Sequence, residues 1–118
     1  MTIRPRRSLL YMPGSNPRAL DKARSLPADG LILDLEDAVA PDAKQLAREQ
    51  IGAALEEGGY GHRELLLRIN GLATEWGGDD IRAIAALPTQ PDAILIPKID
   101  TALDVVDAIA AIDEAGCP

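Results

Sequence analysis

Aromatic residues are scarce in this sequence: they make up 3% of its 118 residues, and there is no phenylalanine. Any hydrophobic core must therefore be built from alanine, leucine, isoleucine and valine, a composition that suits α/β packing with helices against a sheet. The same scarcity argues against a nucleic-acid-binding surface that relies on aromatic stacking. A chain of 118 residues can bury one small core but is short for two.

The sequence also has fewer basic than acidic residues, a single cysteine and no long apolar run. The net charge is −7, whereas proteins that bind nucleic acid usually present a basic face. The single cysteine, Cys117, excludes an intramolecular disulfide bond and fits a reducing compartment. No apolar run approaches the length of a membrane span, and the run after Arg7 stops at Pro13, too early for a signal sequence. We therefore expect a cytoplasmic protein that binds neither nucleic acid nor membrane.

Short apolar runs recur along the chain, and each is continuous rather than alternating, which is typical of parallel strands covered on both faces. These predicted strands are residues 8–12, 31–35, 65–69 and 93–97. Helical spacing, capping residues and terminating glycines or prolines between and after them predict helices. These helices run from Pro17 to about Leu26, from Pro41 to Gly58, from Asp79 to Pro88 and from Thr101 to Gly116.

The predicted order is therefore four successive βα units, each of about 25 to 35 residues. Two architectures accept this pattern. One is an open, doubly wound sheet, and the other is half of a (β/α)8 barrel, which in full needs about 250 residues. Both folds place their chemistry at the carboxyl ends of the strands, so the residues that follow each run are the candidates for function.

The first predicted strand is followed by a glycine turn, residues 13–16, that leads into a helix. Backbone N–H groups and the positive end of the helix dipole can hold a phosphate there, and Arg18 and Lys22 add positive charge. An ordinary turn with Asn16 as the helix cap explains the same residues. The spacing matches neither the phosphate loop of nucleotide hydrolases nor the glycine pattern of dinucleotide-binding domains.

The second predicted strand ends in three carboxylates within four residues, Asp34, Glu36 and Asp37. Like charges at the end of a buried strand repel each other unless a cation or its bound waters relieve them, and oxygen ligands suit Mg²⁺. A solvated acidic loop is the alternative. We favour the metal interpretation because Asp34 directly continues an apolar strand.

Two basic residues end the remaining strands. The planar guanidinium of Arg68 can grip a carboxylate at two points, or it can form a structural ion pair with the acidic residues one strand away. The two interpretations are compatible. Lys98 follows Pro97, and we interpret it as a charge partner for carboxylates. A Schiff-base lysine usually needs apolar surroundings to lower its pKa, and this end of the sheet is rich in acid.

Taken together, the four strand ends resemble the citrate lyase β-subunit and malyl-CoA lyase family, the HpcH/HpaI aldolases. The matching segments are residues 7–14, 28–41, 67–70 and 95–98, and Lys44 and Arg48 also match. Four motifs in the right order on four successive strands are a far more specific signal than any one of them alone.

The resemblance implies an α/β protein with a TIM-barrel fold, of which residues 1–118 supply about the first four βα units, the N-terminal half of a single domain. It also implies a magnesium-dependent carbon–carbon lyase. Such an enzyme cleaves or forms a β-hydroxyacyl thioester of the malyl-CoA, citramalyl-CoA or citryl type, with a 2-oxoacid and an acyl thioester as the other partners. The alternatives are a non-catalytic half-barrel that binds an acyl thioester or a partner, and an open-sheet domain of the response-regulator type.

By the resemblance, Arg68 binds the carboxylate of the oxoacid and belongs to the catalytic group with Glu36 and Asp37. The two acids support the waters bound to Mg²⁺, and Lys98 binds substrate and balances the acidic charge. In the family, the direct metal ligands come from the fifth and sixth strands, so we expect them beyond Pro118.

The resemblance places Arg18 and Lys22, more loosely, near the phosphates of the CoA thioester. It also implies a homo-oligomer. Because the direct metal ligands are not among these residues, we expect the 118-residue chain alone to be inactive. Because four βα units leave two open edge strands, we expect it to pair with another copy or to aggregate.

Overall fold

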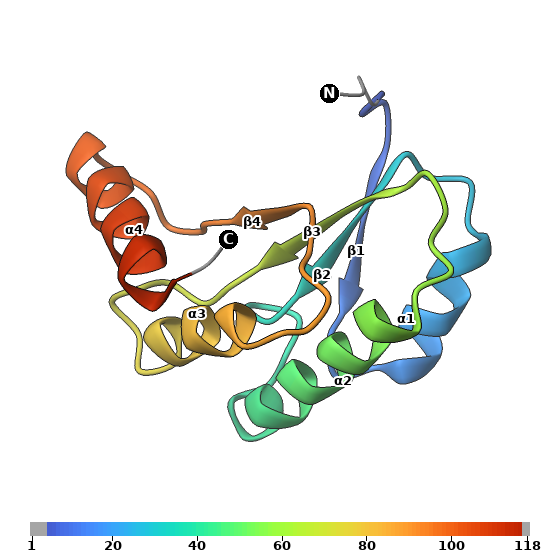
Figure 1. Cartoon of the computed structure of the whole chain (residues 1–118), viewed down its shortest axis with the longest axis horizontal. Helices are drawn as coiled ribbons and strands as arrows, with labels where there is room; N and C mark the ends of the chain where they lie inside the picture. The colour runs from blue at the N-terminus through green and yellow to red at the C-terminus, as the bar shows by residue number, and fades with distance from the viewer. Residues whose placement is uncertain (1–4, 117–118) are drawn as a thin grey trace.

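The computed structural model describes residues 5–116, and in them four strands alternate with four α-helices in the predicted order (Figure 1). The strands are β1 (Leu9–Pro13), β2 (Gly30–Asp34), β3 (Glu64–Arg68) and β4 (Ala93–Leu95). The helices are α1 (Pro17–Lys22), α2 (Lys44–Glu57), α3 (Gly77–Ala85) and α4 (Ala102–Ala115), with 3-10 turns at 23–25 and 41–43.

Two predicted caps are confirmed by hydrogen bonds. The side chain of Asn16 accepts from the backbone N–H of Ala19 at the start of α1, and Thr101 forms a reciprocal capping box at the start of α4. Several boundaries differ from the prediction by one to four residues. Helix α1 gives way to a 3-10 turn at Ala23, and β4 ends at Leu95, before Pro97, which has no N–H to donate to a neighbouring strand.

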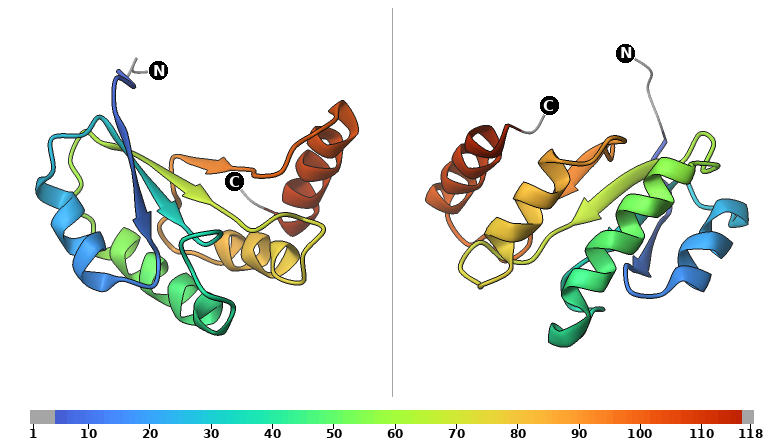
Figure 2. Two further views of the ribbon diagram at one scale, coloured as in Figure 1. Left: turned by 180° about the vertical axis from the view of Figure 1, so that it is seen from behind. Right: turned by 60° about the horizontal axis from the view of Figure 1, so that its bottom comes forward.

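The four strands form one parallel sheet in the order β1-β2-β3-β4. Doubly wound sheets reverse their strand order at a switch point, as in the 2-1-3-4-5 order of response regulators, and carry helices on both faces. Here the order has no reversal, and α1, α2 and α3 lie on the same face of the sheet (Figures 1 and 2). This order and the placing of three helices on one face differ from a doubly wound sheet, and they are compatible with consecutive βα units of a barrel.

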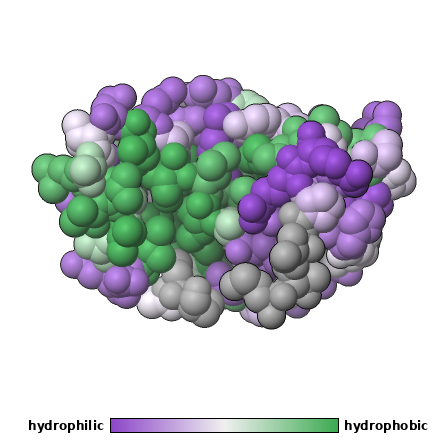
Figure 3. Space-filling model, turned by 90° about the horizontal axis from the view of Figure 1, so that it is seen from above, coloured by the Kyte–Doolittle hydropathy of each residue, from purple (hydrophilic) through white to green (hydrophobic). Residues whose placement is uncertain are grey.

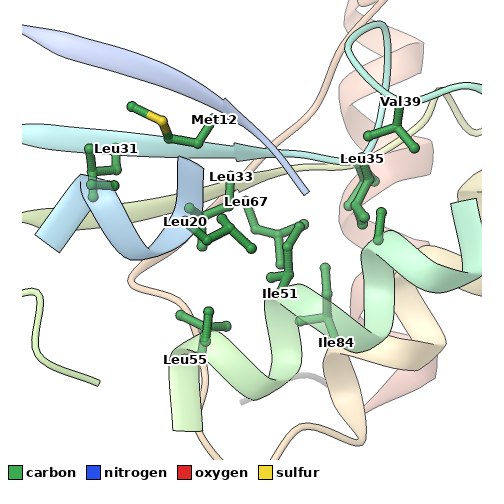
Figure 4. Packing of buried hydrophobic residues seen from close by; sticks show 14 of the residues in the cluster. Met12, Leu20, Leu31, Leu33, Leu35, Val39, Ile51, Leu55, Leu67 and Ile84 are labelled. Atoms are coloured by element: carbon green, nitrogen blue, oxygen red, sulfur yellow. The ribbon is translucent and has the colours of Figure 1, made fainter. Parts of the chain in front are cut away.

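The core lies between the sheet and these helices. Leu31 and Leu33 of β2 point from the sheet toward Ile51 and Leu55 of α2, and all four side chains are at most 3% exposed (Figure 4). We expected strands covered on both faces. All five residues of β2 are buried, as expected, but α1 to α3 share one face of the sheet, and on the opposite face Tyr11 of β1 is 51% exposed. None of the helices within residues 5–116 is both long and apolar enough to cross a membrane.

Candidate functional site

The predicted site residues of β2, β3 and the loop after β4 come together at the carboxyl edge of the sheet. Parallel pairing sets Asp34 beside Arg68, and Arg68 beside Leu95. Glu36 and Asp37, which follow β2, and Lys98, which follows β4, therefore lie at the same edge of the sheet. This is the edge at which barrel and doubly wound enzymes carry their chemistry.

Asp34 and Arg68 form a two-point ion pair. Nε and Nη2 of Arg68 each donate to a different carboxylate oxygen of Asp34, both at 2.8 Å. Asp34 is fully buried and also accepts from the backbone N–H groups of Glu36 and Ala38. Burial alone would raise the pKa of Asp34, but the hydrogen bonds from Arg68 and the two amides outweigh it and lower the pKa below its usual value.

The structural ion pair foreseen for Arg68 is therefore present, and it occupies one edge of the guanidinium. Nη1 lies 3.3 Å from Oε1 of Glu36, and the guanidinium stacks 4.6 Å from the centre of the Tyr11 ring. The hydrogen bonds to Asp34 hold the pKa of Arg68 above its usual value, so its charge is permanent. The result is a fixed cation whose Nη1 side faces the acidic loop, the segment after β2 that contains Glu36 and Asp37.

Lys98 occupies the position expected of a charge partner. Its Nζ lies 3.8 Å from Oε2 of Glu36 and 3.8 Å from Oδ2 of Asp37. The side chain is 68% exposed, so the ammonium remains solvated and the contacts are loose. The backbone of Lys98 has a φ of 58°, in the left-handed region that non-glycine residues rarely adopt and that recurs at functional sites.

A metal site is not formed by these residues alone. Within residues 5–116, no group of three acidic, histidine or cysteine side chains is arranged to hold an ion. The Asp34 carboxylate is committed to Arg68 and two amides, so protein cations rather than a metal relieve the repulsion that the sequence indicated. Glu36 is buried between Arg68 and Lys98, whereas the Asp37 side chain is 70% exposed, and carboxylates so placed can accept hydrogen bonds from waters on Mg²⁺.

A buried polar network beneath the site was not predicted from the sequence. Its centre is Asp80 of α3, which is fully buried and accepts from Arg48 at 2.7 Å and from the Asn70 side chain at 2.6 Å. Asn70 also donates to the carbonyl of Leu35. The network links α2, α3 and the end of β3 to the acidic loop. In the sequence, Asp80 is only one of two acidic residues near the start of a helix.

Lys44 holds the backbone of the acidic loop in place through two hydrogen bonds. Its Nζ donates to the carbonyl oxygens of Leu35 and Glu36, at 2.8 and 2.7 Å, and lies 5.1 Å from the centre of the Trp76 ring. The residue is only 6% exposed, and its burial lowers the pKa of the ammonium despite the surrounding carboxylates. The match of Lys44 to the family motif marked this position, but only the structure shows its contacts.

Arg18 and Lys22 do not join this cluster. Both are exposed on α1, and neither forms an ion pair with another residue in the described part of the chain. Helix α1 is six residues long, and its cap Asn16 is engaged with Ala19. The residues thus form a separate basic surface beside β1, and a role with CoA phosphates stays a prediction.

A surface pocket of about 350 Å³ adjoins the cluster. It lies between the loops that follow β3 and β4 and the first turns of α4. Its walls include Leu72, Ile96 and Pro97, with Lys98 at the side of the acidic loop. The pocket therefore offers an apolar cleft beside charged groups, which is the usual character of a small-molecule site.

Curated proteins with similar sequences include enzymes of two kinds. The chain is 53% identical over 108 residues to a (3S)-malyl-CoA thioesterase of Cereibacter sphaeroides, covering 92% of this chain and 37% of that protein. It is 40% identical over 104 residues to citrate lyase subunit beta of Escherichia coli, covering 88% and 34%. It is also 42% identical over 116 residues to an L-malyl-CoA/beta-methylmalyl-CoA lyase of C. sphaeroides, covering 95% and 36%. The chain thus spans about a third of the length of these relatives.

Solved structures agree with the sequence matches. Protein CitE from Mycobacterium tuberculosis, in complex with magnesium and acetoacetate, superposes with a TM-score of 0.68 at 30% identity, over 84% of this chain and 38% of that one. The same protein with magnesium, acetoacetate and coenzyme A gives 0.64 at 28% identity, over 84% and 34%. The sequence model of the HpcH/HpaI aldolase/citrate lyase family matches residues 7–116. The chain therefore belongs to the HpcH/HpaI aldolase/citrate lyase family.

Proposed function

We propose that this chain carries part of the active site of a magnesium-dependent enzyme that cleaves or forms the carbon–carbon bond of a β-hydroxyacyl-CoA thioester. The observation that carries the proposal is the Arg68 guanidinium, which Asp34 fixes at the carboxyl edge of the sheet with Nη1 directed toward Glu36. Membership of the family supports it, as do relatives named as citrate lyase subunit beta and malyl-CoA lyase.

In this proposal Arg68 binds the carboxylate of the 2-oxoacid. Nε and one N–H of Nη2 already donate to Asp34. The oxoacid carboxylate would therefore accept hydrogen bonds from Nη1 and from the second N–H of Nη2. Tyr11 stacks on the guanidinium and limits its movement, while Lys98 offsets the charge of the acidic loop. A positively charged, pre-oriented fork selects a planar carboxylate over a neutral carbonyl compound.

Glu36 and Asp37 support the metal in the proposed enzyme. Their carboxylates at the open edge orient metal-bound water, and the ligands that contact Mg²⁺ directly lie outside residues 5–116. When bound, Mg²⁺ supplies Lewis-acid polarisation of the oxoacid and of the enolate oxygen that develops as the bond breaks. Arg18 and Lys22 are proposed to attract the phosphates of CoA from the exposed side of α1.

Thioester hydrolysis is the second candidate, because one relative at 53% identity is named (3S)-malyl-CoA thioesterase. The two reactions differ in the bond that breaks. A lyase converts malyl-CoA to glyoxylate and acetyl-CoA, with no water consumed. A thioesterase adds water across the thioester and releases malate and free CoA. Product analysis therefore separates them.

The experiment is a chimera in which residues 7–116 replace the matching segment of the C. sphaeroides malyl-CoA lyase. With Mg²⁺ and malyl-CoA it is expected to release glyoxylate and acetyl-CoA, detected with a carbonyl reagent and by chromatography. Arg68→Lys in the chimera should lower kcat/KM at least about tenfold, since a charge-assisted hydrogen bond is worth about 1.5–3 kcal/mol.

The matched control is Arg82→Lys, because Arg82 is an exposed arginine paired on α3 with Asp79. It should leave turnover unchanged. A folded chimera that neither cleaves nor hydrolyses malyl-CoA contradicts the proposed function. Full activity in the Arg68→Lys chimera contradicts the role of Arg68. Release of malate and free CoA without glyoxylate selects the thioesterase.

A further inference from the structure

Two polar side chains beneath the acidic loop are buried and have no part in the function proposed above. Figure 3 shows a broad apolar area on the face seen from above, but Asn70 and Asp80 lie inside the molecule, 2% and 0% exposed. Polar groups at this depth cost free energy unless hydrogen bonds satisfy them, and replacing a bonded pair by apolar groups of the same shape can be nearly neutral for stability. Packing alone therefore does not account for their presence.

Asn70 contributes to holding the backbone with which the acidic loop begins. Every backbone polar group of Leu35 and Glu36 is engaged in a hydrogen bond. Their two N–H groups donate to the last carbonyl of β3 and to the carboxylate of Asp34. Their two carbonyls accept from Nζ of Lys44, and the Leu35 carbonyl also accepts from Nδ2 of Asn70 at 2.9 Å. The start of the loop is thus fixed from both adjacent strands and from α2.

Asp80 determines which way the Asn70 amide points. One carboxylate oxygen of Asp80 accepts from both the backbone N–H and Nδ2 of Asn70, at 2.8 and 2.6 Å. The other oxygen accepts from Nε of Arg48 at 2.7 Å, which fixes the carboxylate from α2. An ionised carboxylate only accepts hydrogen bonds, so the NH2 group of the amide must face it. The second N–H of that group then reaches the carbonyl of Leu35.

We propose that Asn70 and Asp80 are positioning residues that hold the acidic loop in register with Arg68. The inference rests on the function proposed above, in which the two carboxylates of the loop support the waters on Mg²⁺. Asn70 lies two residues after Arg68, and it bonds to Leu35, the first residue after β2. One amide therefore couples the strand end that bears the guanidinium to the loop that bears the carboxylates. Such supporting hydrogen bonds keep the groups around a metal in their productive geometry.

A purely structural role for the network predicts a different outcome. If Asn70 and Asp80 served only to stabilise the packing of α2 and α3, their loss would affect metal and substrate binding together, or neither. A positioning role predicts a split between the two. The acidic loop shifts when its support is removed, whereas Arg68 keeps both hydrogen bonds to Asp34. Affinity for Mg²⁺ then falls while recognition of the oxoacid carboxylate is retained.

The test uses the chimera that carries residues 7–116 in the malyl-CoA lyase, now with Asn70→Leu. Leucine keeps the branched shape of asparagine and removes both side-chain N–H donors. Isothermal titration calorimetry with Mg²⁺ should show a dissociation constant raised about tenfold, the lower end of the effect of losing an outer-shell partner. The KM for malyl-CoA at saturating Mg²⁺ should stay within about twofold, because Arg68 remains fixed.

Asp80→Asn tests whether Asp80 acts through Asn70. The new amide places an NH2 group against a donor of either Arg48 or Asn70, so the Asn70 side chain loses its fixed orientation. The dissociation constant for Mg²⁺ should rise as it does in Asn70→Leu. Combined with Asn70→Leu, the substitution should raise it no further, since effects transmitted through one residue are not additive. A further rise in the double variant overturns the role of Asp80.

Tyr60→Phe is the matched control. Tyr60 lies before β3, at the opposite edge of the sheet, and is 3% exposed. Its hydroxyl donates to the carbonyl of Leu20 at 2.9 Å, so this variant also loses one buried hydrogen bond from a side chain to the backbone. It should lower the melting temperature to a similar extent and leave the dissociation constant for Mg²⁺ unchanged.

Three results overturn the inference: an unchanged affinity for Mg²⁺ in Asn70→Leu, a parallel loss of Mg²⁺ affinity and of malyl-CoA recognition, and an equal effect of Tyr60→Phe. If circular dichroism shows that Asn70→Leu does not fold, Lys44→Met replaces it, because it removes the other donor to the Leu35 carbonyl. An unchanged dissociation constant in Lys44→Met then overturns the inference. Failure of the proposed function is a separate result, since an unmodified chimera that binds Mg²⁺ without converting malyl-CoA contradicts that function and leaves the calorimetric comparison to decide the inference.

Discussion

Replacing Arg68 by methionine tests whether the ion pair at the carboxyl edge is as strongly coupled as its geometry indicates. The substitution keeps an unbranched side chain of moderate length that still packs on Tyr11. It removes both hydrogen bonds to Asp34 and the contact with Glu36. Asp34 remains as a carboxylate that is fully buried and lacks a counter-ion.

The expected cost follows from what Asp34 retains. Removing one partner of a buried ion pair typically costs about 3–5 kcal/mol. Here Asp34 keeps the backbone N–H groups of Glu36 and Ala38, and the Arg68 side chain is 18% exposed, so solvent screens part of the interaction. We therefore expect Arg68→Met to lower the free energy of unfolding by about 2–4 kcal/mol at neutral pH.

The loss should depend on pH with a defined sign. The pKa of Asp34 in the folded state lies below its usual value of 3.8. Its contribution to stability is therefore present above that value and is lost as the pH falls through the lowered pKa. In Arg68→Met, burial without the guanidinium raises the pKa of Asp34, so protonation relieves the penalty at higher pH. The difference between the two proteins should shrink as the solution becomes acidic.

Urea unfolding at one protein concentration, between about pH 7 and pH 3, measures this difference. Arg82→Met is the control, because the Arg82–Asp79 pair is exposed and such pairs contribute about 0–1 kcal/mol. A loss from Arg68→Met no larger than that of the control, or a loss independent of pH, would refute the assignment of Asp34 as a buried, ionised partner.

Two further substitutions test the support of the site. Lys44→Met removes the donor to the carbonyl of Glu36, so it should lower the free energy of unfolding by about 1–3 kcal/mol in thermal melts, while exposed Gln45→Met should not. Gly77→Ala places a Cβ against the carbonyl oxygen of Gly71, which forces the backbone apart and should cost about 1–3 kcal/mol. Gly78→Ala, whose Cβ meets only the flexible Arg82 side chain at 3.5 Å, should be tolerated in the same melts.

The elements of the fold were predictable because their signals are local. Continuous apolar runs identified all four strands within a few residues, and Asn16, Thr101 and Gly58 marked helix ends that the structure confirms. Strand order was not predictable from periodicity, since a doubly wound sheet and a barrel wall use the same βα units. The order depends on which strands pair, and those contacts join residues far apart in the sequence.

The sequence predicted that the strand-end residues lie together and that Arg68 and Lys98 pair with the acidic residues, but it did not predict the polar network beneath them. Strand ends indicated Glu36, Arg68 and Lys98, because parallel strands bring their carboxyl ends to one edge. Nothing in the local pattern showed that Asp80, ten residues beyond Asn70, closes a buried network with Arg48. Its neighbours depend on how α2 and α3 pack side by side, which is a property of the assembled fold.

The buried ion pair itself argues for function over stability. Burying a carboxylate and a guanidinium costs desolvation, and apolar residues of similar volume often stabilise a protein equally well or better. The pair occurs at the carboxyl edge, where Arg68 still has donors directed toward the acidic loop. Two carboxylates from the adjoining loop, Glu36 and Asp37, lie within 3.8 Å of a second cation, Lys98. A cation held in place by Asp34, at the edge where Lys98 adds a second and exposed positive charge, is an arrangement suited to recognition of an anionic substrate.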